Sequence, residues 1–286
     1  MLFENERLQI GAFEVRPTTD ACGEVERQRM NAIVLPLSGL FARHDAPGRQ
    51  LTGTPSQAIY FAPDAPYRIS FPGAVGDRGI VLRFDEALVP AQVGRQGGEA
   101  PAAQGLLPAK AMVLRNLLWA RLDNNEADGF EAEALGLDLL SWSLESVHRA
   151  SRPARHSALA RRIRAVERVK EAVASAPSDK WSVARLARLA NLSPFHLCHV
   201  FRGMTGTSIY DYVLHERLAQ TLDAVLDSDD AFTAIALDAG FASHSHFTAR
   251  FRDFFGCAPS VLRRIATATQ VAELRKIVTA RASRSR

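Results

Sequence analysis

Histidine and cysteine side chains, which bind metals or form hydrogen bonds, gather at two short stretches of this 286-residue sequence. The first stretch holds His196, Cys198 and His199, and the second holds His244 and His246. His196 and His199 are three residues apart, so their imidazoles could face one metal ion from the same side of a helix. A transition-metal site takes three or more protein ligands, however, and no second pair stands nearby. The spacing favours polar side chains that face a partner, and we expect neither a metal nor another cofactor.

Both stretches lie at the start of an expected helix. Ser193 is a good N-cap with Pro194 at the first helical position, while Ser243 caps the second helix and Gly256 ends it. The second helix carries an apolar stripe at helical spacing, formed by Phe247, Phe251 and Phe254. This stripe predicts the side that faces the core, and the polar residues fall on or beside the opposite side.

A shorter helical run precedes each of these helices and is joined to it by a tight turn. The upstream run, capped by Ser182, leads through Asn191, and the downstream run leads through Gly240. Helix, turn and second helix form the outline of a helix-turn-helix, whose second helix enters the major groove of DNA. Two such motifs are predicted, at about 182–204 and 231–255. Their matching residues keep an offset of 49 before the turn and 50 after it, which marks an internal repeat.

The segment from about residue 161 to 264 resembles the DNA-binding domain of AraC/XylS-type transcription regulators. The residues that carry the resemblance are Ser193-Pro194-Phe195-His196-Leu197, Phe201-Arg202, Thr205-Gly206, Ile235-Ala236, Gly240-Phe241, Ser243, Ser245, Phe247, Phe251-Arg252, Phe255-Gly256 and Pro259. The resemblance implies a sequence-specific regulator of transcription with a variable sensing domain in front. It is compatible with an activator, although the sequence does not distinguish an activator from a repressor.

The helical faces and the resemblance select nearly the same candidate DNA contacts. The resemblance implies the following base-reading positions: Phe195, Cys198, His199, His244, Ser245, Thr248 and Ala249. Arg202 and Arg252 are expected on phosphates, which set the register of the protein without reading sequence. Flanking histidines and helix caps complete the predicted DNA-binding set, namely His196, His246, Ser182, Ser193 and Ser243.

The chain departs from the family pattern at two of these positions. Family members often carry Arg where this sequence has His199 and Ala249. Arg is the usual bidentate reader of guanine, worth about 1–3 kcal/mol per base pair. We therefore expect weaker guanine recognition, with more weight on histidine and on apolar contacts to thymine methyl groups.

Charge is unevenly divided along the chain. Residues 1–150 carry 14 Lys and Arg against 19 Asp and Glu, a net charge of −5, whereas residues 151–286 carry 21 against 12, a net charge of +9. Counterion release from DNA phosphates requires such a basic surface. No apolar run reaches the roughly 18 residues that span a membrane, and the first residues lack the apolar core of a signal peptide. We expect a cytoplasmic protein without a membrane partner.

Residues 1–105 contain short apolar and β-branched runs separated by turns. Strands are predicted at 9–15, 31–37, 56–61, 67–71 and 79–84. Such strands without intervening helices predict a sandwich or small barrel, and the family resemblance implies a cupin-like one. The expected fold is therefore α+β with two domains: a cupin-like β-barrel or sandwich with an αα-hairpin, followed by an all-α double helix-turn-helix.

The αα-hairpin is predicted from two amphipathic helices at about 106–122 and 130–148. In the AraC family such helices often form a dimer interface, so a homodimer is one interpretation, and packing on the chain's own barrel is the other. The basic, proline-containing stretch 151–157 is the best linker. It separates a sensing or dimerisation domain at 1–150 from a DNA-binding domain at 158–286.

The strand-rich segment contains one histidine, His44, which is too few for the metal of a cupin enzyme. No Ser/His/Asp set or phosphate-binding glycine loop is evident, so we expect no enzymatic activity. Barrel mouths commonly hold ligands. The candidate residues of an effector pocket are Arg43, His44, Tyr60, Tyr67 and Arg68. Alternatively, these are core or surface residues of a barrel that only dimerises or docks.

A long helix at 207–226, with Tyr210 on its predicted core side, joins the two helix-turn-helix motifs. A further helix at 270–279 and a basic tail at 281–286 are expected near the end of the chain. The sequence thus predicts a transcriptional regulator that binds promoter or operator DNA under the control of a small-molecule effector, with RNA polymerase as a further partner. The alternatives are a cupin-like enzyme fused to a DNA-binding module and a ligand-independent DNA-binding protein.

Overall fold

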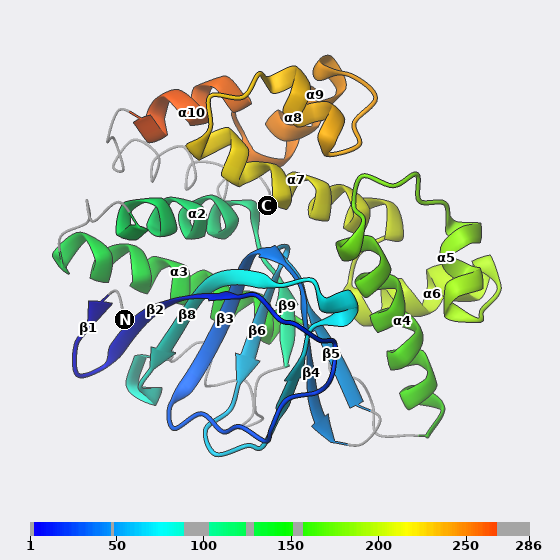
Figure 1. Cartoon of the computed structure of the whole chain (residues 1–286), viewed down its shortest axis with the longest axis horizontal. Helices are drawn as coiled ribbons and strands as arrows, with labels where there is room; N and C mark the ends of the chain where they lie inside the picture. Colours follow the sequence, from blue (N-terminus) through cyan, green and yellow to red (C-terminus); the bar gives the residue numbers. More distant parts are fainter. Residues whose placement is uncertain (1–2, 47–48, 89–102, 124–128, 151–156, 268–286) are drawn as a thin grey trace.

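Two antiparallel sheets form the N-terminal part of the chain in a computed structural model, which describes residues 3–46, 49–88, 103–123, 129–150 and 157–267 (Figure 1). The larger sheet has the strand order β1-β2-β8-β3-β6-β9, and the smaller one has the order β5-β4-β7. The strands of the larger sheet are β1 (Phe3–Glu4), β2 (Leu8–Val15), β8 (Asp77–Phe84), β3 (Asn31–Gly39), β6 (Gln57–Phe61) and β9 (Gln104–Leu106). Those of the smaller sheet are β5 (Arg49–Gly53), β4 (Phe41–Ala46) and β7 (Arg68–Ser70).

Strand β8 holds the larger sheet together, because it pairs along its length with β2 on one side and with β3 on the other. Successive side chains of a strand point to opposite faces. Ile80, Leu82 and Phe84 therefore join one buried cluster, while Val81 joins a different cluster that contains residues of both sheets. One face of β8 thus packs against helices, and the other faces the space between the sheets.

Helices α2 (Ala109–Asp123) and α3 (Gly129–Arg149) pack on the outer face of the larger sheet (Figure 1). Leu118 of α2 and Leu139 of α3 are fully buried in the same cluster as the outward residues of β8. Gly136 lies where α3 approaches β2, since a Cβ atom there would come within 2.6 Å of the Ile10 side chain. The two helices predicted for this segment are therefore present and pack on the chain's own sheet.

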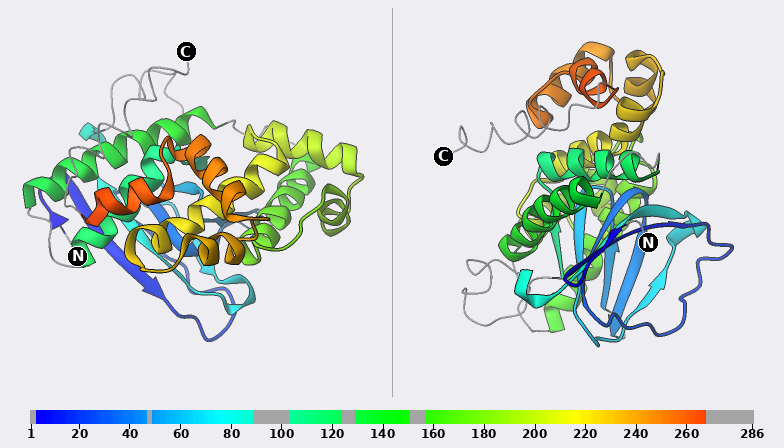
Figure 2. Two further views of the ribbon diagram at one scale, coloured as in Figure 1. Left: turned by 90° about the horizontal axis from the view of Figure 1, so that it is seen from above. Right: turned by 90° about the vertical axis from the view of Figure 1, so that its left-hand side faces the viewer.

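The C-terminal part of the chain is helical. Its helices are α4 (Ser157–Ser175), α5 (Val183–Ala190), α6 (Pro194–Thr205), α7 (Ile209–Asp227), α8 (Phe232–Asp238), α9 (His244–Phe255) and α10 (Pro259–Thr267). Helices α4 to α6 and the first half of α7 enclose a cluster around Phe201 and Tyr212. The second half of α7 and helices α8 to α10 enclose another around Phe247 and Phe251, which is continuous with the α2–α3 core. In Figure 2, α2 and α3 lie between the sheets and α8 to α10.

The start of the connecting helix α7 differs from the prediction. Tyr210, expected on the core side, is 62% exposed, whereas Tyr212 is fully buried and meets the Phe201 ring edge-on at 5.3 Å between centroids. Tyr212, Glu216 and Ala219 recur at helical spacing and are all fully buried. Because this stripe includes the charged residue Glu216, its pattern did not indicate the buried side of the helix. The prediction for Tyr210 was therefore wrong.

The five predicted strands correspond to β2, β3, β6, β7 and β8, whereas β1, β4, β5 and β9 were not predicted. Strands β4 and β5 form a hairpin in which Phe41 pairs with Gly53, and polar residues interrupt both. The linker predicted at 151–157 lies outside the described residues except for Ser157, which begins α4. The helix predicted at 270–279 and the tail at 281–286 also lie outside the described residues.

Candidate nucleic-acid interface

The first helix pair, α5 and α6, is fixed by side-chain caps at both of its N-termini. Ser182 accepts a hydrogen bond from the backbone N–H of Arg185 (3.2 Å), and Ser193 accepts one from that of His196 (3.3 Å). Asn191 ends α5 in a left-handed conformation with φ of 53° and turns the chain towards α6. Because the caps satisfy N–H groups that have no partner within the helix, they fix where each helix begins.

The second pair, α8 and α9, has a glycine at its turn. Gly240 has φ of 76°, and a Cβ atom there would lie 2.5 Å from the carbonyl oxygen of Ser178, so only glycine fits. Ser243 accepts a hydrogen bond from the backbone N–H of His246 (3.1 Å) and starts α9. Gly256 ends α9 with φ of 87°. Helices α6 and α9 therefore begin in the same way.

Both of these second helices bury an apolar stripe and expose the opposite side. Leu197 and Phe201 of α6 and Phe247 and Phe251 of α9 are fully buried. The exposed residues include most of the predicted DNA contacts, namely Ser182, Ser193, Phe195, Cys198, His199, Arg202, Ser243, His244, Ser245, Ala249 and Arg252. Phe195 is 85% exposed, so its ring is accessible to a partner.

Three of the predicted contacts are partly buried. His196 is half-buried at the start of α6, and the hydroxyl of Thr248 lies 3.3 Å from Nε2 of His244. The ring of His246 meets the Phe241 ring edge-on at 5.6 Å, and its Nδ1 is buried without a hydrogen-bond partner. His246 therefore packs against the turn before α9, while His244, Ser245, Ala249 and Arg252 of α9 are exposed.

Comparison with known proteins supports this interpretation of the C-terminal part. A family model described as a helix-turn-helix domain matches residues 186–265. The HTH-type transcriptional regulator GlxA of Rhizobium meliloti (strain 1021) is 33% identical over 144 residues, which are 46% of this chain and 44% of GlxA. The HTH-type transcriptional regulator MtrA of Neisseria gonorrhoeae is 28% identical over 88 residues, which are 31% of this chain and 29% of MtrA.

Residues 186–265 form a helix-turn-helix domain of the AraC type. The matches span less than half the length of GlxA and of MtrA. Among solved structures, ToxT from Vibrio cholerae O395 is 12% identical, with a TM-score of 0.36, and the superposition covers 92% of this chain and 99% of ToxT.

Neither a metal cluster nor a membrane-spanning helix accompanies the AraC-type domain in the part of the chain that the structure describes. Among the described residues, no three His, Cys, Asp or Glu side chains converge on a point where they would hold a metal ion. None of the described helices is both long enough and apolar enough to cross a bilayer.

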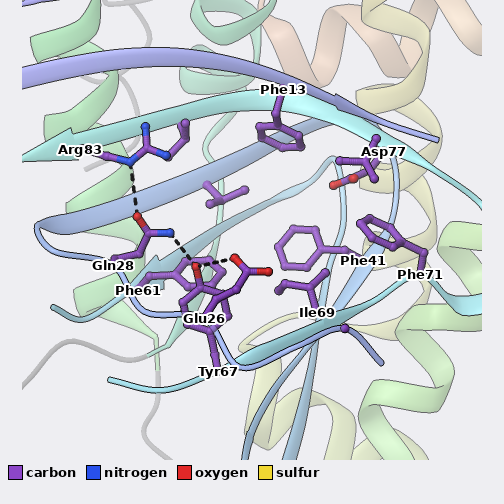
Figure 3. A pocket seen from close by; sticks show the side chains of 14 residues that line it. Phe13, Glu26, Gln28, Phe41, Phe61, Tyr67, Ile69, Phe71, Asp77 and Arg83 are labelled. Carbon is purple, nitrogen blue, oxygen red and sulfur yellow. Dashed lines mark hydrogen bonds between the residues drawn. The ribbon is translucent and has the colours of Figure 1, made fainter. Parts of the chain in front are cut away.

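In front of the AraC-type domain, a cavity of about 390 Å³ lies between the two sheets (Figure 3). Five of its fourteen lining residues are aromatic, namely Phe13, Phe41, Phe61, Tyr67 and Phe71. A chain of hydrogen bonds lies at one end: Arg83 donates to Gln28 (3.3 Å), Gln28 donates to the Tyr67 hydroxyl (2.6 Å), and that hydroxyl donates to Glu26 (3.2 Å). Burial raises the pKa of Tyr67, so its hydroxyl stays protonated. This cavity is the candidate effector site.

One of the five predicted effector residues, Tyr67, lines this cavity, and the other four, Arg43, His44, Tyr60 and Arg68, are not among its lining residues. Arg43 is buried, lies over the Phe61 ring at 4.7 Å and donates a hydrogen bond to the Tyr60 carbonyl. Arg68 is exposed at the start of β7. Its strand has the predicted position, but this side chain points to solvent.

His44 and Tyr60 also have partners within the protein. His44 Nε2 lies 2.8 Å from the Ser70 hydroxyl, and burial lowers the pKa of His44, an effect that Asp45 opposes. The Tyr60 hydroxyl donates to Asn31 (2.6 Å). The polar residues that do line the cavity were not identified from the sequence, namely Glu26, Gln28, Asp77 and Arg83. Glu26 and Gln28 lie in the loop before β3, and Asp77 and Arg83 lie near the two ends of β8. No spacing between neighbouring residues could therefore have identified them as one site.

Proposed function

We propose that this chain is a sequence-specific DNA-binding regulator of transcription, in which α6 and α9 each enter a major groove as the second helix of a helix-turn-helix. The observation that carries the proposal is a repeat in three dimensions. Both helices start at a serine N-cap, end at a left-handed glycine and expose equivalent sides. A helix-turn-helix presents its recognition helix in this way, and the relatives GlxA and MtrA are named as transcriptional regulators.

The length of α7 supports a double helix-turn-helix. The helix has 19 residues and is therefore about 29 Å long at 1.5 Å per residue. One turn of B-DNA is about 34 Å. Because its first half packs with α4 to α6 and its second half with α8 to α10, α7 is a rigid spacer. It would hold the two recognition helices against successive major grooves on one face of the duplex.

The exposed residues of α6 and α9 divide by chemistry. Arg202 and Arg252 would contact phosphates and set the register, while the histidines and Ser245 would contact base edges. Phe195 has no polar group and would contact a thymine methyl group. With His199 and Ala249 at positions where the family often has Arg, guanine readout is expected to be weak.

The proposal extends to the sheet-rich part as a sensing domain. We assign a cupin-like barrel to residues 1–150, with the effector in the cavity between the sheets, and the DNA-binding domain to residues 158–286. The effector would shift the population of DNA-competent arrangements through its different affinity for each. No enzymatic step is proposed. A homodimer through α2 and α3, contact with RNA polymerase and a cytoplasmic location complete the proposal.

Selection of bound duplexes from a random DNA pool by the full chain tests the double helix-turn-helix. We expect two short conserved segments whose centres lie about 10 base pairs apart, since each recognition helix reads one groove and the grooves of one face recur once per turn. Selected duplexes that share no sequence would instead indicate a ligand-independent structural DNA-binding protein. A single conserved segment would contradict the use of both α6 and α9.

Substitutions on α9 then separate phosphate contacts from base contacts. Arg252→Ala should weaken binding to all selected sequences alike and lower the slope of log affinity against log salt by about one. Ser245→Ala should weaken the base preference at one position of the site by at most about 1–3 kcal/mol, without changing the slope of log affinity against log salt. Arg16→Ala, at an exposed site on the front domain, is the charge control. An Arg252→Ala effect no larger than that of the control would contradict the assignment.

A further inference from the structure

The candidate effector cavity contains one buried carboxyl oxygen without a hydrogen-bond partner. Asp77, the first residue of β8, is 5% exposed and lines the cavity, and its Oδ1 has no hydrogen-bond partner. Its partners across the sheet are Val15 and Gly39, which carry no charge. Its neighbour Arg78 points to the other face and pairs with Asp223 of α7. A buried polar group without a partner costs free energy, so this group marks a position that a ligand can satisfy.

The other polar groups of the cavity lie towards its far end and are bonded to one another. Asp77, Val81 and Arg83 occupy one face of β8, and six residues of strand separate the first from the last by about 20 Å. In Figure 3, Asp77 lies beside Phe41 and Phe71, Arg83 lies at the opposite end with Gln28, and Glu26 lies between the two ends beside Tyr67. The cavity therefore combines a wall of aromatic rings with a single unsatisfied acceptor at the Asp77 end.

We propose that this cavity binds a hydrophobic organic amine whose protonated amino group donates a hydrogen bond to Asp77 while its apolar body lies among the aromatic rings. An ammonium group supplies the donor that Oδ1 lacks and the positive charge that a buried carboxylate needs. The faces of neighbouring rings also attract a cation. An anionic ligand would meet the carboxylate of Asp77 and is excluded by repulsion. The inference rests on the proposed ligand-controlled function and names its ligand class.

The state of Asp77 without ligand gives the proposal a pH dependence. Burial raises the pKa of Asp77 to about 7, so at neutral pH part of the population must lose a proton before the ammonium group binds. The other charged groups on the walls are Glu26 and Arg83, and Arg43 lies behind Phe61 with Asp45. The part of the pH dependence that belongs to Asp77 is the part that Asp77→Asn removes.

Calorimetric titration of the full chain with matched ligands tests the proposal without any substitution. The amines are benzylamine, 2-phenylethylamine and tryptamine, and the controls are 2-phenylethanol and phenylacetate, which share the ring but carry a neutral or negative group. At about pH 8 we expect at least one amine to bind about tenfold more tightly than the alcohol, as a charge-assisted hydrogen bond requires. Its affinity should fall about tenfold for each pH unit below 7. Equal affinity of amine and alcohol, tighter binding of phenylacetate, or no binding of any amine would overturn the ligand class.

Asp77→Asn provides the second test, because it keeps the shape of the side chain and removes the charge. The variant should lose the preference for the amine and its pH dependence while keeping the affinity for the alcohol; a retained preference would contradict the role of Asp77. The same samples are then tested for binding to the selected duplexes. Amine binding without any DNA binding would overturn the proposed function alone, and DNA binding without amine binding would overturn this inference alone.

Discussion

The buried carboxyl group of Asp77 affects the stability of the fold as well as ligand binding. The pKa of Asp77 rises from 3.8 to about 7 because burial disfavours its ionised form. The resulting stability is fully present below pH 3.8 and is lost as the pH rises through about 7, where the folded chain must ionise the group. Such a shift corresponds to roughly 4 kcal/mol at most.

Asp77→Asn should therefore stabilise the ligand-free chain above pH 7 by up to a few kcal/mol, and the gain should vanish towards about pH 4. The free energy of unfolding, measured by urea denaturation across this pH range for parent and variant, gives the difference directly. Asp20→Asn is the matched control because Asp20 is exposed. A gain that does not depend on pH would show that Asp77 is not the titrating group.

At the residue scale, the sequence was informative where a local rule applies. Phe195, His199 and Arg252 were predicted to face outward because helical spacing assigns a face to every residue of a helix, and the structure exposes all three. Asp77 follows Gly76 and precedes Arg78 in what looks like an ordinary turn. Its burial depends on pairing with strands 40 to 70 residues earlier in the chain, which no local pattern reveals.

At the scale of elements, the turn between α8 and α9 depends on one glycine. Gly240 combines a positive φ of 76° with a Cβ position only 2.5 Å from the Ser178 carbonyl oxygen, whereas Gly206 has a similar φ of 75° and open space around it. An L-residue in the left-handed region costs about 1–2 kcal/mol. Forcing an atom into packed backbone adds roughly 1–3 kcal/mol.

Gly240→Ala should therefore destabilise the chain by roughly 2–5 kcal/mol, and Gly206→Ala by only about 1–2 kcal/mol. Urea denaturation followed by circular dichroism measures both, and the matched conformation makes Gly206→Ala the control for backbone strain alone. Equal costs would mean that the Ser178 backbone yields and that the close approach does not fix the position of α9.

The helices and their ends were largely predictable, because capping and stripes are properties of neighbouring residues. Ser182, Ser193 and Ser243 were identified as N-caps, and each accepts the expected backbone hydrogen bond. The sheets were less predictable. Strands β4 and β5 contain Arg43 and Thr52, polar residues that are buried by contacts across the fold, so alternation of polar and apolar residues fails as a guide there.

At the scale of the whole molecule, buried polar contacts join the sheet-rich part to the helical part. Glu216 of α7 is fully buried and accepts hydrogen bonds from the hydroxyls of Thr54 and Ser56, each at 2.5 Å. Burial raises the pKa of Glu216, and the hydrogen bonds from these hydroxyls oppose the shift. On α4, the fully buried Lys170 is paired with Glu167 at 2.9 Å. The hydroxyl partners of Glu216 are 162 and 160 residues away in sequence, too distant to be predicted, whereas Glu167 is three residues from Lys170 on the same helix.

Replacement of the two hydroxyls tests whether Glu216 links the two parts. Thr54→Val with Ser56→Ala leaves the carboxyl group buried without these donors, so the pair should cost roughly 3–5 kcal/mol. In a Glu216→Met background no charge needs a donor, and the same pair should cost less than about 1.5 kcal/mol. Urea denaturation of the parent, the hydroxyl pair, Glu216→Met and the combination gives the coupling energy. Additive costs would mean that the carboxyl group does not depend on the sheet. A strong coupling would mean that α7, the helix between α6 and α9, is held by the turn that carries Thr54 and Ser56, next to the sheets that form the cavity. A signal from a bound effector to the DNA-binding helices would need such a contact.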